Sequence, residues 1–394
     1  MKEKNYNFDE CVNRLNTRSE KWDGLSHVFL KPDLLPLWVA DMDFLSPDPI
    51  RDAILRRAEH GIYGYTFLTP SYFEAVINWF KRRHGWTLQK DWLIFTPGVI
   101  PAINFAVQAF SKPHDKVIVQ NPAYPPFFNA IKINGRKRLL NPLRLNNGCY
   151  EMNLKDLEKK ARNPRAKMII LCSPHNPTGR VWKKEELTHL GEICLDNQIL
   201  VLSDEIHCDL IYPGHKHTPF ASMSKKFAQN SITCTSPSKT FNLPGLKVSN
   251  IVIPNEKLRN SFKKVVNCAG GNEPNCFASI ALEAAYNECE GWLDEVMLYI
   301  KENLEFLKDF VKSNLPEVEV IEPEGTYLAW LDFRRLGLSA RQLSKVLLEK
   351  AKVALFKGSL FGKGGKGFNR INLACPRSIL KDALNRIANA IKNR

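Results

Sequence analysis

The chain has 394 residues, 44% of them hydrophobic and 25% charged, with 24 prolines and 21 glycines. These values are close to the averages of globular proteins, so they exclude disordered and fibrous classes and allow roughly two or three domains with a sizeable core. The formal net charge is +15, but the lysines and arginines are spread along the chain, which indicates solvated faces rather than a nucleic-acid-binding surface.

The ten cysteines are scattered, without a CxxC pair or a His/Cys spacing suited to zinc. We therefore expect reduced thiols, no metal site and a cytoplasmic protein. The first thirty residues carry charges throughout and contain no continuous apolar run, so we expect no secretory signal. No window approaches the roughly 20 apolar residues of a membrane helix, and we expect no membrane partner.

The first segment, residues 1–45, is irregular and contains prolines, which is typical of an arm lying over a domain. From about Ser46 onward, helical periodicity alternates with short apolar runs. The predicted strands are DWLIFT (91–96), KVIVQ (116–120), KMIILC (167–172), ILVLS (199–203), SITCT (231–235) and KVSNIVI (247–253). The predicted helices follow Pro97 and cover 153–161 and 183–197. This alternation predicts an α/β domain with a mostly parallel sheet between helices.

Strongly helical sequence covers 274–313 and leads to a second group of elements, which predicts a smaller α+β domain. The predicted elements of this domain are VEVIEP (318–323), TYLAWLDF (326–333), a helix over 340–350, VALFK (353–357), RINLAC (370–375) and a terminal helix over 379–392. The glycine-rich segment 358–367 leads into a strand and not a helix, so we interpret it as a mobile loop near the substrate entrance rather than a phosphate-binding loop.

Four of the predicted strands are followed by reactive or polar side chains. DWLIFT is followed by Pro97-Gly98-Val99-Ile100 and a helix, KMIILC by SPHNPTG (173–179), ILVLS by Asp204, and SITCT by SPSKT (236–240). In an open α/β sheet, ligands bind outside the carboxyl ends of the strands. We therefore expect these groups to meet on one rim of the sheet.

Together these segments supply a phosphate seat, an amide, a carboxylate and a lysine amine. A helix N-terminus after Gly98 offers free backbone N–H groups to a phosphate, and Ser236 and Ser238 add hydroxyl groups. Lys239 can form a Schiff base with an aldehyde, and Asp204 can keep a pyridine nitrogen protonated so that the ring accepts electrons. These are the requirements of pyridoxal 5′-phosphate, the cofactor that the sequence predicts.

The segments SPHNPTGRVW (173–182), LSDEIHCDL (202–210) and SPSKTFNLPGLK (236–247) resemble the fold-type I pyridoxal phosphate enzymes, the class I and II aminotransferase superfamily. Five further segments are similar to its cystathionine β-lyase and cystalysin branch, which cleaves carbon–sulfur bonds: PLWVADMDF (36–44), YGYTFLTPSYFEAVINW (63–79), NPAYPPFF (121–128), PEGTYLAWLDF (323–333) and GFNRINLACPR (367–377). The resemblance implies an N-terminal arm (1–45) packing with the small domain, a large cofactor-binding domain (46–285) and a small C-terminal domain (286–394).

The resemblance also implies roles for single residues. Lys239 is expected to be the Schiff-base lysine and the acid/base at the substrate Cα, and Asp204 the partner of the pyridine nitrogen. Tyr124 is expected to stack on the ring, and Asn176 to hydrogen-bond its phenolic oxygen. Arg370 is expected to bind the substrate α-carboxylate in a bidentate fork, with Trp38 as a pocket wall. The implied phosphate-binding groups are the backbone of Val99 and Ile100, with Ser236, Ser238 and Lys247.

Two positions depart from the family pattern. Lys247 stands where many members have an arginine that pairs with the phosphate, and a lysine keeps the attraction but loses the bidentate fork. His207 stands where many aminotransferases have a tyrosine that donates to the ring oxygen. A cofactor contact and a structural histidine at a strand end are both open for His207.

We expect β-elimination on an L-cysteine S-conjugate such as cystathionine, giving pyruvate, ammonia and a thiol. One alternative is an aminotransferase, since both reactions begin with the same lysine and the same cofactor linkage. A second alternative is a regulatory or interaction protein that retains the fold, which the basic charge favours slightly. The resemblance further implies a homodimer with shared active sites, because Tyr65 matches a tyrosine that reaches the partner subunit.

Overall fold

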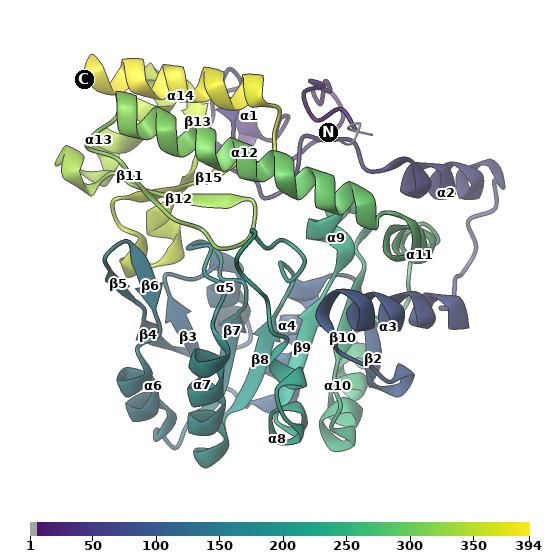
Figure 1. Cartoon of the computed structure of the whole chain (residues 1–394). Helices are drawn as coiled ribbons and strands as arrows, with labels where there is room; N and C mark the ends of the chain where they lie inside the picture. The colour runs from purple at the N-terminus through teal and green to yellow at the C-terminus, as the bar shows by residue number, and fades with distance from the viewer. Residues whose placement is uncertain (1–5) are drawn as a thin grey trace.

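The computed structural model describes residues 6–394, so the first five residues of the predicted arm lie outside the described part. The larger of the two main sheets has seven strands, in the order β2-β10-β9-β8-β7-β3-β4 (Figure 1). Its strands are β2 (Leu93–Thr96), β3 (Lys116–Asn121), β4 (Lys137–Pro142), β7 (Ala166–Cys172), β8 (Leu200–Asp204), β9 (Ser231–Thr235) and β10 (Ser249–Val252). The five adjacent strands β9, β8, β7, β3 and β4 form four parallel pairs, whereas β10 is antiparallel to both β2 and β9. The mostly parallel sheet predicted from the sequence is confirmed.

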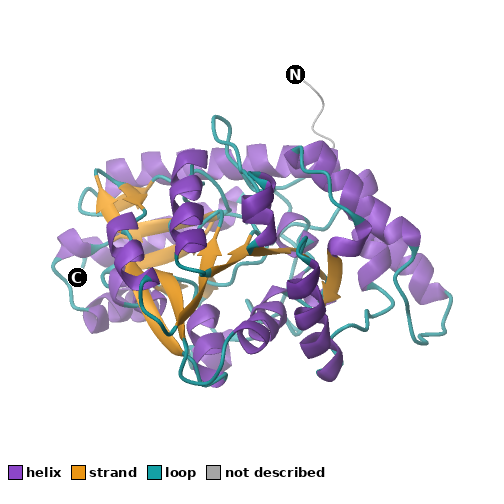
Figure 2. Cartoon of the chain, turned by 90° about the horizontal axis from the view of Figure 1, so that it is seen from below, coloured by secondary structure: helices purple, strands orange, loops and turns teal. Residues whose placement is uncertain are grey.

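Helices cover both faces of this sheet because successive residues of a strand point to opposite sides. In β7, Met168 and Ile170 pack with one set of helices, whereas Ile169 and Leu171 pack with the other. The first face is covered by α4 (Val99–Phe110), α5 (Pro125–Ile133) and α10 (Glu256–Cys268), and the second by α6 (Leu154–Ala161), α7 (Lys184–Asp196) and α8 (Lys225–Gln229). Figure 2 shows the sheet between these layers.

A smaller four-stranded sheet lies beside the large one, in the order β11-β12-β15-β14. Its strands are β11 (Glu319–Ile321), β12 (Leu328–Asp332), β14 (Phe356–Lys357) and β15 (Phe368–Asn372). The long helix α12 (Glu290–Asn314) and the last helix α14 (Arg377–Lys392) contact each other and lie over this sheet (Figure 1). The remaining helix of this part, α13 (Ala340–Lys345), continues into a π-helical turn at Val346–Lys350.

Two predicted elements are divided in the structure. The run 353–357 is not one strand: β13 (Val353–Ala354) pairs with β1 (Leu35–Pro36), whereas β14 joins the four-stranded sheet. The helical stretch 274–313 is two helices, α11 (Ala278–Glu288) and α12, which meet at Cys289. The predicted domain boundary at residue 285 therefore falls inside α11.

The segment 358–367, expected to be a mobile loop, is instead packed. It forms two 3₁₀ turns, Gly358–Phe361 and Lys363–Gly365, and the Phe361 side chain is fully buried. The Asn121 side chain donates to the Phe361 carbonyl at 2.9 Å and accepts from a backbone N–H of the second turn at 2.9 Å. A Cβ atom on Gly365 would lie 2.0 Å from a carbonyl oxygen. Its glycines thus serve close packing and not mobility.

The remaining elements lie at the N-terminal side and around the sheet edges. They are α1 (Leu25–Val28), α2 (Asp48–Glu59), α3 (Pro70–His84), the hairpin of β5 (Arg144–Asn146) and β6 (Cys149–Glu151), and the short helix α9 (Pro237–Thr240). Helix α3 begins at Thr69, whose side chain accepts from a backbone N–H, and ends at Gly85 in a left-handed conformation. Among residues 6–394, no helix has the length and apolar character needed to cross a bilayer.

Candidate active site

A cavity of about 300 Å³ opens at the carboxyl ends of the central strands. It is lined by Ala40, Pro97, Gly98, Val99, Ile100, Pro101, Tyr124, Cys172, Asn176, Asp204, Ile206, His207, Ser238, Lys239, Pro244, Lys247 and Val248. A second cavity of about 700 Å³ shares Ala40, Tyr124, Lys239 and Lys247 with it and extends to Trp38, Asp41 and Arg370. Most of the predicted site residues therefore meet in two adjoining cavities, as expected for the rim of an open α/β sheet.

Lys239 projects from the short helix α9, which follows β9. Its Nζ donates to the Ala40 carbonyl at 2.6 Å. Burial lowers the pKa of Lys239 to about 8, even though the nearby Asp41 carboxylate favours the charged amine. The side chain thus holds an amine that is neutral in an appreciable fraction of molecules near neutral pH, as a nucleophilic lysine requires.

Asp204 is the last residue of β8 and is buried. Burial raises its pKa to about 7, and the neighbouring Glu205 carboxylate adds to the shift. The Ile206 backbone N–H donates to its Oδ1 at 3.2 Å, and no ion pair to Asp204 occurs within residues 6–394. A buried carboxyl group without a counterion is costly, so Asp204 suits a ligand that brings its own N–H donor.

The N-terminus of α4 lines the first cavity. Gly98 precedes the helix with φ 120°, a backbone conformation that favours glycine, and no side chain caps the helix. The first backbone N–H groups of α4, including those of Val99 and Ile100, therefore lack helical partners and point to the cavity end of the helix. This arrangement attracts an anion.

The other predicted phosphate ligands differ in position. Ser238 and Lys247 line the first cavity, Lys247 with φ 55° directly after a 3₁₀ turn. Ser236 does not line it: its hydroxyl lies 2.6 Å from the Val248 carbonyl and accepts from the Ser238 backbone N–H at 3.1 Å, capping α9. The sequence shows that a serine is present at position 236, but it does not show that its hydroxyl is directed to the backbone and not to the cavity.

Asn176 and Arg370 meet between the two cavities. Arg370 comes from β15, is 2% exposed, and donates to Asn176 Oδ1 at 3.0 Å and to the Trp38 carbonyl at 2.9 Å. Its guanidinium lies over the Phe356 ring at 4.7 Å. Burial lowers the pKa of Arg370 to about 10, and no carboxylate of the described chain pairs with it. Since a buried guanidinium without a partner is destabilising, Arg370 is suited to an anionic ligand.

Tyr124 and His207 also line the first cavity. Burial raises the pKa of Tyr124, so its hydroxyl stays protonated. Burial and the Lys239 charge lower the pKa of His207 to about 3, which keeps its imidazole neutral. Its Nδ1 has no hydrogen-bond partner within the described chain, and an unpartnered buried nitrogen that faces a cavity favours contact with a ligand over a purely structural role.

The arm contributes main-chain oxygens to the site, and sequence reasoning missed this contribution. The Ala40 carbonyl accepts from Lys239 and, at 2.9 Å, from the hydroxyl of Tyr327. The Val39 and Asp41 carbonyls accept from the Asn372 side chain at 2.7 and 2.6 Å. The motif PLWVADMDF can be identified in the sequence, but no residue type shows that its main-chain carbonyl will contact the site. The contact of Tyr327 could have been predicted, since Tyr327 lies in the motif PEGTYLAWLDF.

A buried ion-pair group holds this part of the arm. The fully buried Lys21 pairs with Asp43 at 2.5 Å, Arg14 pairs with the same carboxylate at 2.7 Å, and the Trp22 indole donates to it at 2.9 Å. Burial alone would raise the pKa of Asp43, but Lys21 and these donors outweigh it and hold the pKa below its ordinary value. Trp38 lies on this side, buried, with its indole N–H donating to the Lys21 carbonyl.

Tyr65 is the one predicted site residue far from both cavities. It lies in the irregular stretch between α2 and α3, and its side chain is fully exposed, at 102%. Ile62, Tyr63 and Phe67 of the same stretch are also exposed. The structure therefore does not bring Tyr65 to the site of its own chain.

Comparisons with known proteins agree with this geometry. Residues 32–387 match the family model "Aminotransferase class I and II". The chain is 46% identical to "Cystathionine beta-lyase PatB" of Bacillus subtilis, over 98% of this chain and all of that protein. It is 31% identical to the aspartate aminotransferase of Pyrococcus horikoshii, over 91% of each.

Solved structures give the same result. Cystalysin from Treponema denticola, whose crystal structure contains pyridoxal 5′-phosphate, superposes with a TM-score of 0.96 at 40% identity, over 98% of this chain and 99% of cystalysin. The family model covers most of the chain, from the arm to α14. The chain belongs to the family of class I and II aminotransferases.

Proposed function

We propose that this protein is a pyridoxal 5′-phosphate-dependent carbon–sulfur lyase that cleaves L-cysteine S-conjugates such as cystathionine to pyruvate, ammonia and a thiol. The observation that carries the proposal is that two buried basic groups lie in adjoining cavities. These groups are the Lys239 amine, whose pKa is lowered, and the Arg370 guanidinium, which has no carboxylate partner within the described chain. The likeness to a cystathionine β-lyase and to cystalysin supports the lyase reaction.

The residues of the cavity fit the cofactor. The uncapped start of α4, Ser238 and Lys247 offer donors and positive charge to a phosphate at one end. Asp204 offers a buried carboxyl group of raised pKa to the ring nitrogen. His207 presents an unpartnered nitrogen to the same cavity. Several polar groups that line this cavity therefore lack partners within the described chain, and the cofactor would satisfy them.

When bound, pyridoxal phosphate supplies a protonated ring that stores the electron pair left at the substrate Cα. Lys239 takes the Cα proton, because its lowered pKa leaves a neutral amine available. Asp204 holds the proton on the ring nitrogen. Arg370 binds the α-carboxylate through its guanidinium, which Asn176 and the Trp38 carbonyl orient by hydrogen bonds. The Phe356 ring packs against the guanidinium at 4.7 Å.

The direct test uses the two lysines that line the first cavity. Borohydride reduction of the holoenzyme, followed by peptide mass spectrometry, should find the cofactor fixed on Lys239 and not on Lys247. Lys239→Ala should abolish pyruvate formation from L-cystathionine, with an unchanged far-ultraviolet circular dichroism spectrum as the control for folding. Label on Lys247, or turnover by the Lys239→Ala variant, contradicts the proposal.

The likeness to an aspartate aminotransferase favours transamination as the second candidate. The two reactions separate after the Cα proton is removed, since transamination needs a keto acid and elimination needs a leaving group on Cβ. Incubation with L-cystathionine alone distinguishes them. A lyase forms pyruvate through many turnovers, whereas an aminotransferase stops after a single half-reaction.

We further infer a homodimer with shared active sites. The exposed apolar side chains of Ile62, Tyr63, Tyr65 and Phe67 support it, because such a cluster on a lone chain would be left in water. Mixing Tyr65→Ala with Lys239→Ala under subunit exchange tests it. One site of each mixed dimer then carries neither lesion, so activity should recover toward about a quarter of wild type in a statistical mixture. No recovery contradicts the shared site.

A reducing, cytoplasmic location fits the thiols. All ten cysteines are free, and six of them are buried. Free thiols in this number are typical of compartments kept reduced. Fractionation of the source cells, with the protein followed by antibody, is the measurement that checks this location.

A further inference from the structure

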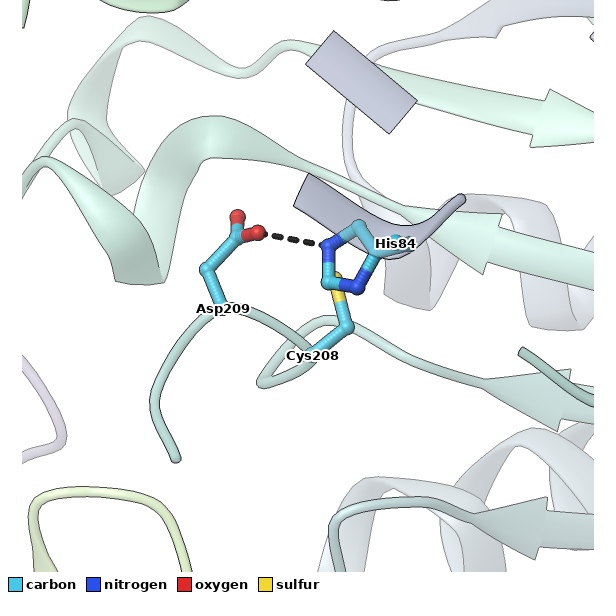
Figure 3. A group of neighbouring side chains, drawn as sticks. All are labelled: His84, Cys208 and Asp209. Carbon is cyan, nitrogen blue, oxygen red and sulfur yellow. Dashed lines mark hydrogen bonds and ion pairs between the residues drawn. The ribbon is translucent and has the colours of Figure 1, made fainter. Parts of the chain in front are cut away.

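A buried carboxylate lies directly behind the helix that carries the catalytic lysine. Asp209 follows β8 and is 5% exposed. Its Oδ2 accepts from the Thr240 hydroxyl at 2.8 Å, and its Oδ1 lies 2.8 Å from His84 Nε2 and accepts from the Trp79 indole at 3.2 Å. Figure 3 shows the His84 ring and the Asp209 carboxylate facing each other, with Cys208 beside them. The proposed mechanism uses none of these groups.

Asp209 keeps its charge in this position. Burial alone would raise its pKa, but the hydrogen bond from His84, that from Thr240 and the nearby Arg83 guanidinium hold the pKa below its ordinary value. Hydrogen bonds to an ionised acceptor are shorter and stronger than neutral ones. The bond between Asp209 and Thr240 is therefore a strong, buried contact between the segment that follows β8 and α9.

Thr240 is the residue after Lys239, and α9 consists of only four residues, Pro237–Thr240. Ser236 fixes the start of α9 by capping it and by its contact with the Val248 carbonyl. Asp209 fixes the end of α9 through Thr240. The lysine thus lies between two side-chain anchors, and such a short helix has few backbone hydrogen bonds of its own to hold its position.

We propose that Asp209 is a positioning residue for Lys239, acting through the Thr240 hydroxyl. This inference rests on the proposed role of Lys239. Without the contact, α9 is free to shift, and the amine leaves the position from which it reaches both the cofactor and the substrate Cα. A displacement of about 1 Å costs up to about 100-fold in rate.

The same group contains side chains of the types that bind metals: His84, Cys208 and Asp209 have ligand atoms within 4.8 Å of one another. The hydrogen bonds already occupy both Asp209 oxygens. Burial raises the pKa of the Cys208 thiol well above its usual value, which keeps it protonated, whereas metal binding needs the thiolate. The geometry favours a hydrogen-bonded anchor.

The test compares three variants of the holoenzyme. Thr240→Val removes the hydroxyl at nearly constant volume, and Thr240→Ser keeps it. The matched control is Thr233→Val on β9, since the buried Thr233 hydroxyl has no partner within the described chain. We expect Thr240→Val to lower kcat by about 10- to 100-fold with KM within about threefold of wild type, and Thr240→Ser and Thr233→Val to behave like wild type. Thr240→Ala replaces Thr240→Val if the latter does not fold.

A second readout does not depend on turnover. The fraction of Lys239 labelled after borohydride treatment, measured across a pH series, should shift in Thr240→Val and not in Thr240→Ser, because the amine changes its surroundings. A lowered melting temperature with unchanged kcat and an unchanged labelling profile overturns the proposal, as does a stoichiometric metal ion that is lost in His84→Gln. If Lys239→Ala retains turnover, the proposed function itself fails. If Lys239→Ala is inactive but Thr240→Val has the kcat of wild type, the positioning role fails and the proposed function stands.

Discussion

The two walls of the site are built from different parts of the chain. On the sheet side, side chains at strand ends line the cavity: Asp204 at the end of β8 and Lys239 after β9. On the arm side, the contacts to Lys239 and Arg370 come from the Ala40 and Trp38 carbonyls. This difference indicates that the sheet side carries the reactive side chains, whereas the arm side holds Lys239 and Arg370 in position. Substitutions in the sheet wall should change rates first, and substitutions in the arm should change stability first.

The largest effect is expected for Asp204→Ala. Under the proposed function, the variant loses the carboxyl group that would keep the ring nitrogen protonated, so kcat should fall by about 10²- to 10³-fold. Because burial of an unpaired carboxyl group is costly, the free energy of unfolding should not decrease. Steady-state kinetics and urea unfolding check both halves. Wild-type kcat, or a large loss of stability, would contradict the assignment of this wall to chemistry.

The arm is tested by Asp43→Asn. This variant removes the nearer carboxylate partner of the fully buried Lys21, at 2.5 Å, and leaves only the Asp41 carboxylate at 3.8 Å, which should cost about 3 kcal/mol of folding stability. Urea unfolding measures the loss. The control is Lys21→Met combined with Asp43→Asn, which removes both charges and should recover most of the stability. A single variant as stable as wild type would show that the ion pair does not hold the arm.

Acid should weaken the same contact. The pKa of Asp43 is held below its ordinary value in the fold, so its contribution to stability is present above the unfolded value of about 3.9 and is lost as the pH falls through the lower folded value. Below about pH 4, the stability of wild type should therefore fall more steeply than that of Asp43→Asn. Equal slopes in urea titrations at several acid pH values would contradict this origin.

Arg370→Lys probes the point where the two walls meet. Arg370 donates to Asn176 on the sheet side and to the Trp38 carbonyl on the arm side. A lysine keeps the charge but not the fork, so KM for the amino-acid substrate should rise by about 10- to 100-fold, with a smaller change in kcat. Steady-state kinetics at saturating cofactor measure the split. A fall in kcat alone would assign Arg370 to the chemical step instead.

The smallest effect is expected for Ser236→Ala. It removes the cap of α9 and should cost about 1 kcal/mol of stability. Ser224 caps α8, away from the cavities, in the same way, so Ser224→Ala should lose a similar stability with unchanged kinetics. We expect only Ser236→Ala to lower kcat, by a few-fold, since α9 carries Lys239. Identical kinetics in both variants would make Ser236 a simple cap.

The sheet wall could be predicted from the sequence, because a polar residue after a buried apolar run marks the rim of an α/β sheet. Asp204 and Lys239 were found by this rule, and both line the cavity. The arm wall could not be predicted in the same way. Every residue has a carbonyl oxygen, so no residue type marks one that contacts the site. The contacts of Ala40 also depend on residues that are distant in sequence, Lys239 and Tyr327.

Two local errors have similar causes. The run 353–357 has the composition of one strand, but its two halves pair with different partners, β1 and β15. The glycines of 358–367 suggest a mobile backbone, whereas Gly358 and Gly365 lie too close to each other's backbone for a Cβ atom at either position. Tertiary pairing decided both cases, and local composition carries no information about it.

The carbonyl wall also affects how the site can change over generations. A main-chain oxygen survives every amino-acid replacement at its own position, so substitutions at Trp38 to Asp41 can alter the shape and charge of the larger cavity while the acceptor facing Lys239 stays in place. That tolerance lasts as long as Lys21 and Asp43 fix the path of the chain. The arm is thus the part of the molecule where the shape of the larger cavity can change while the groups at the strand ends stay in place.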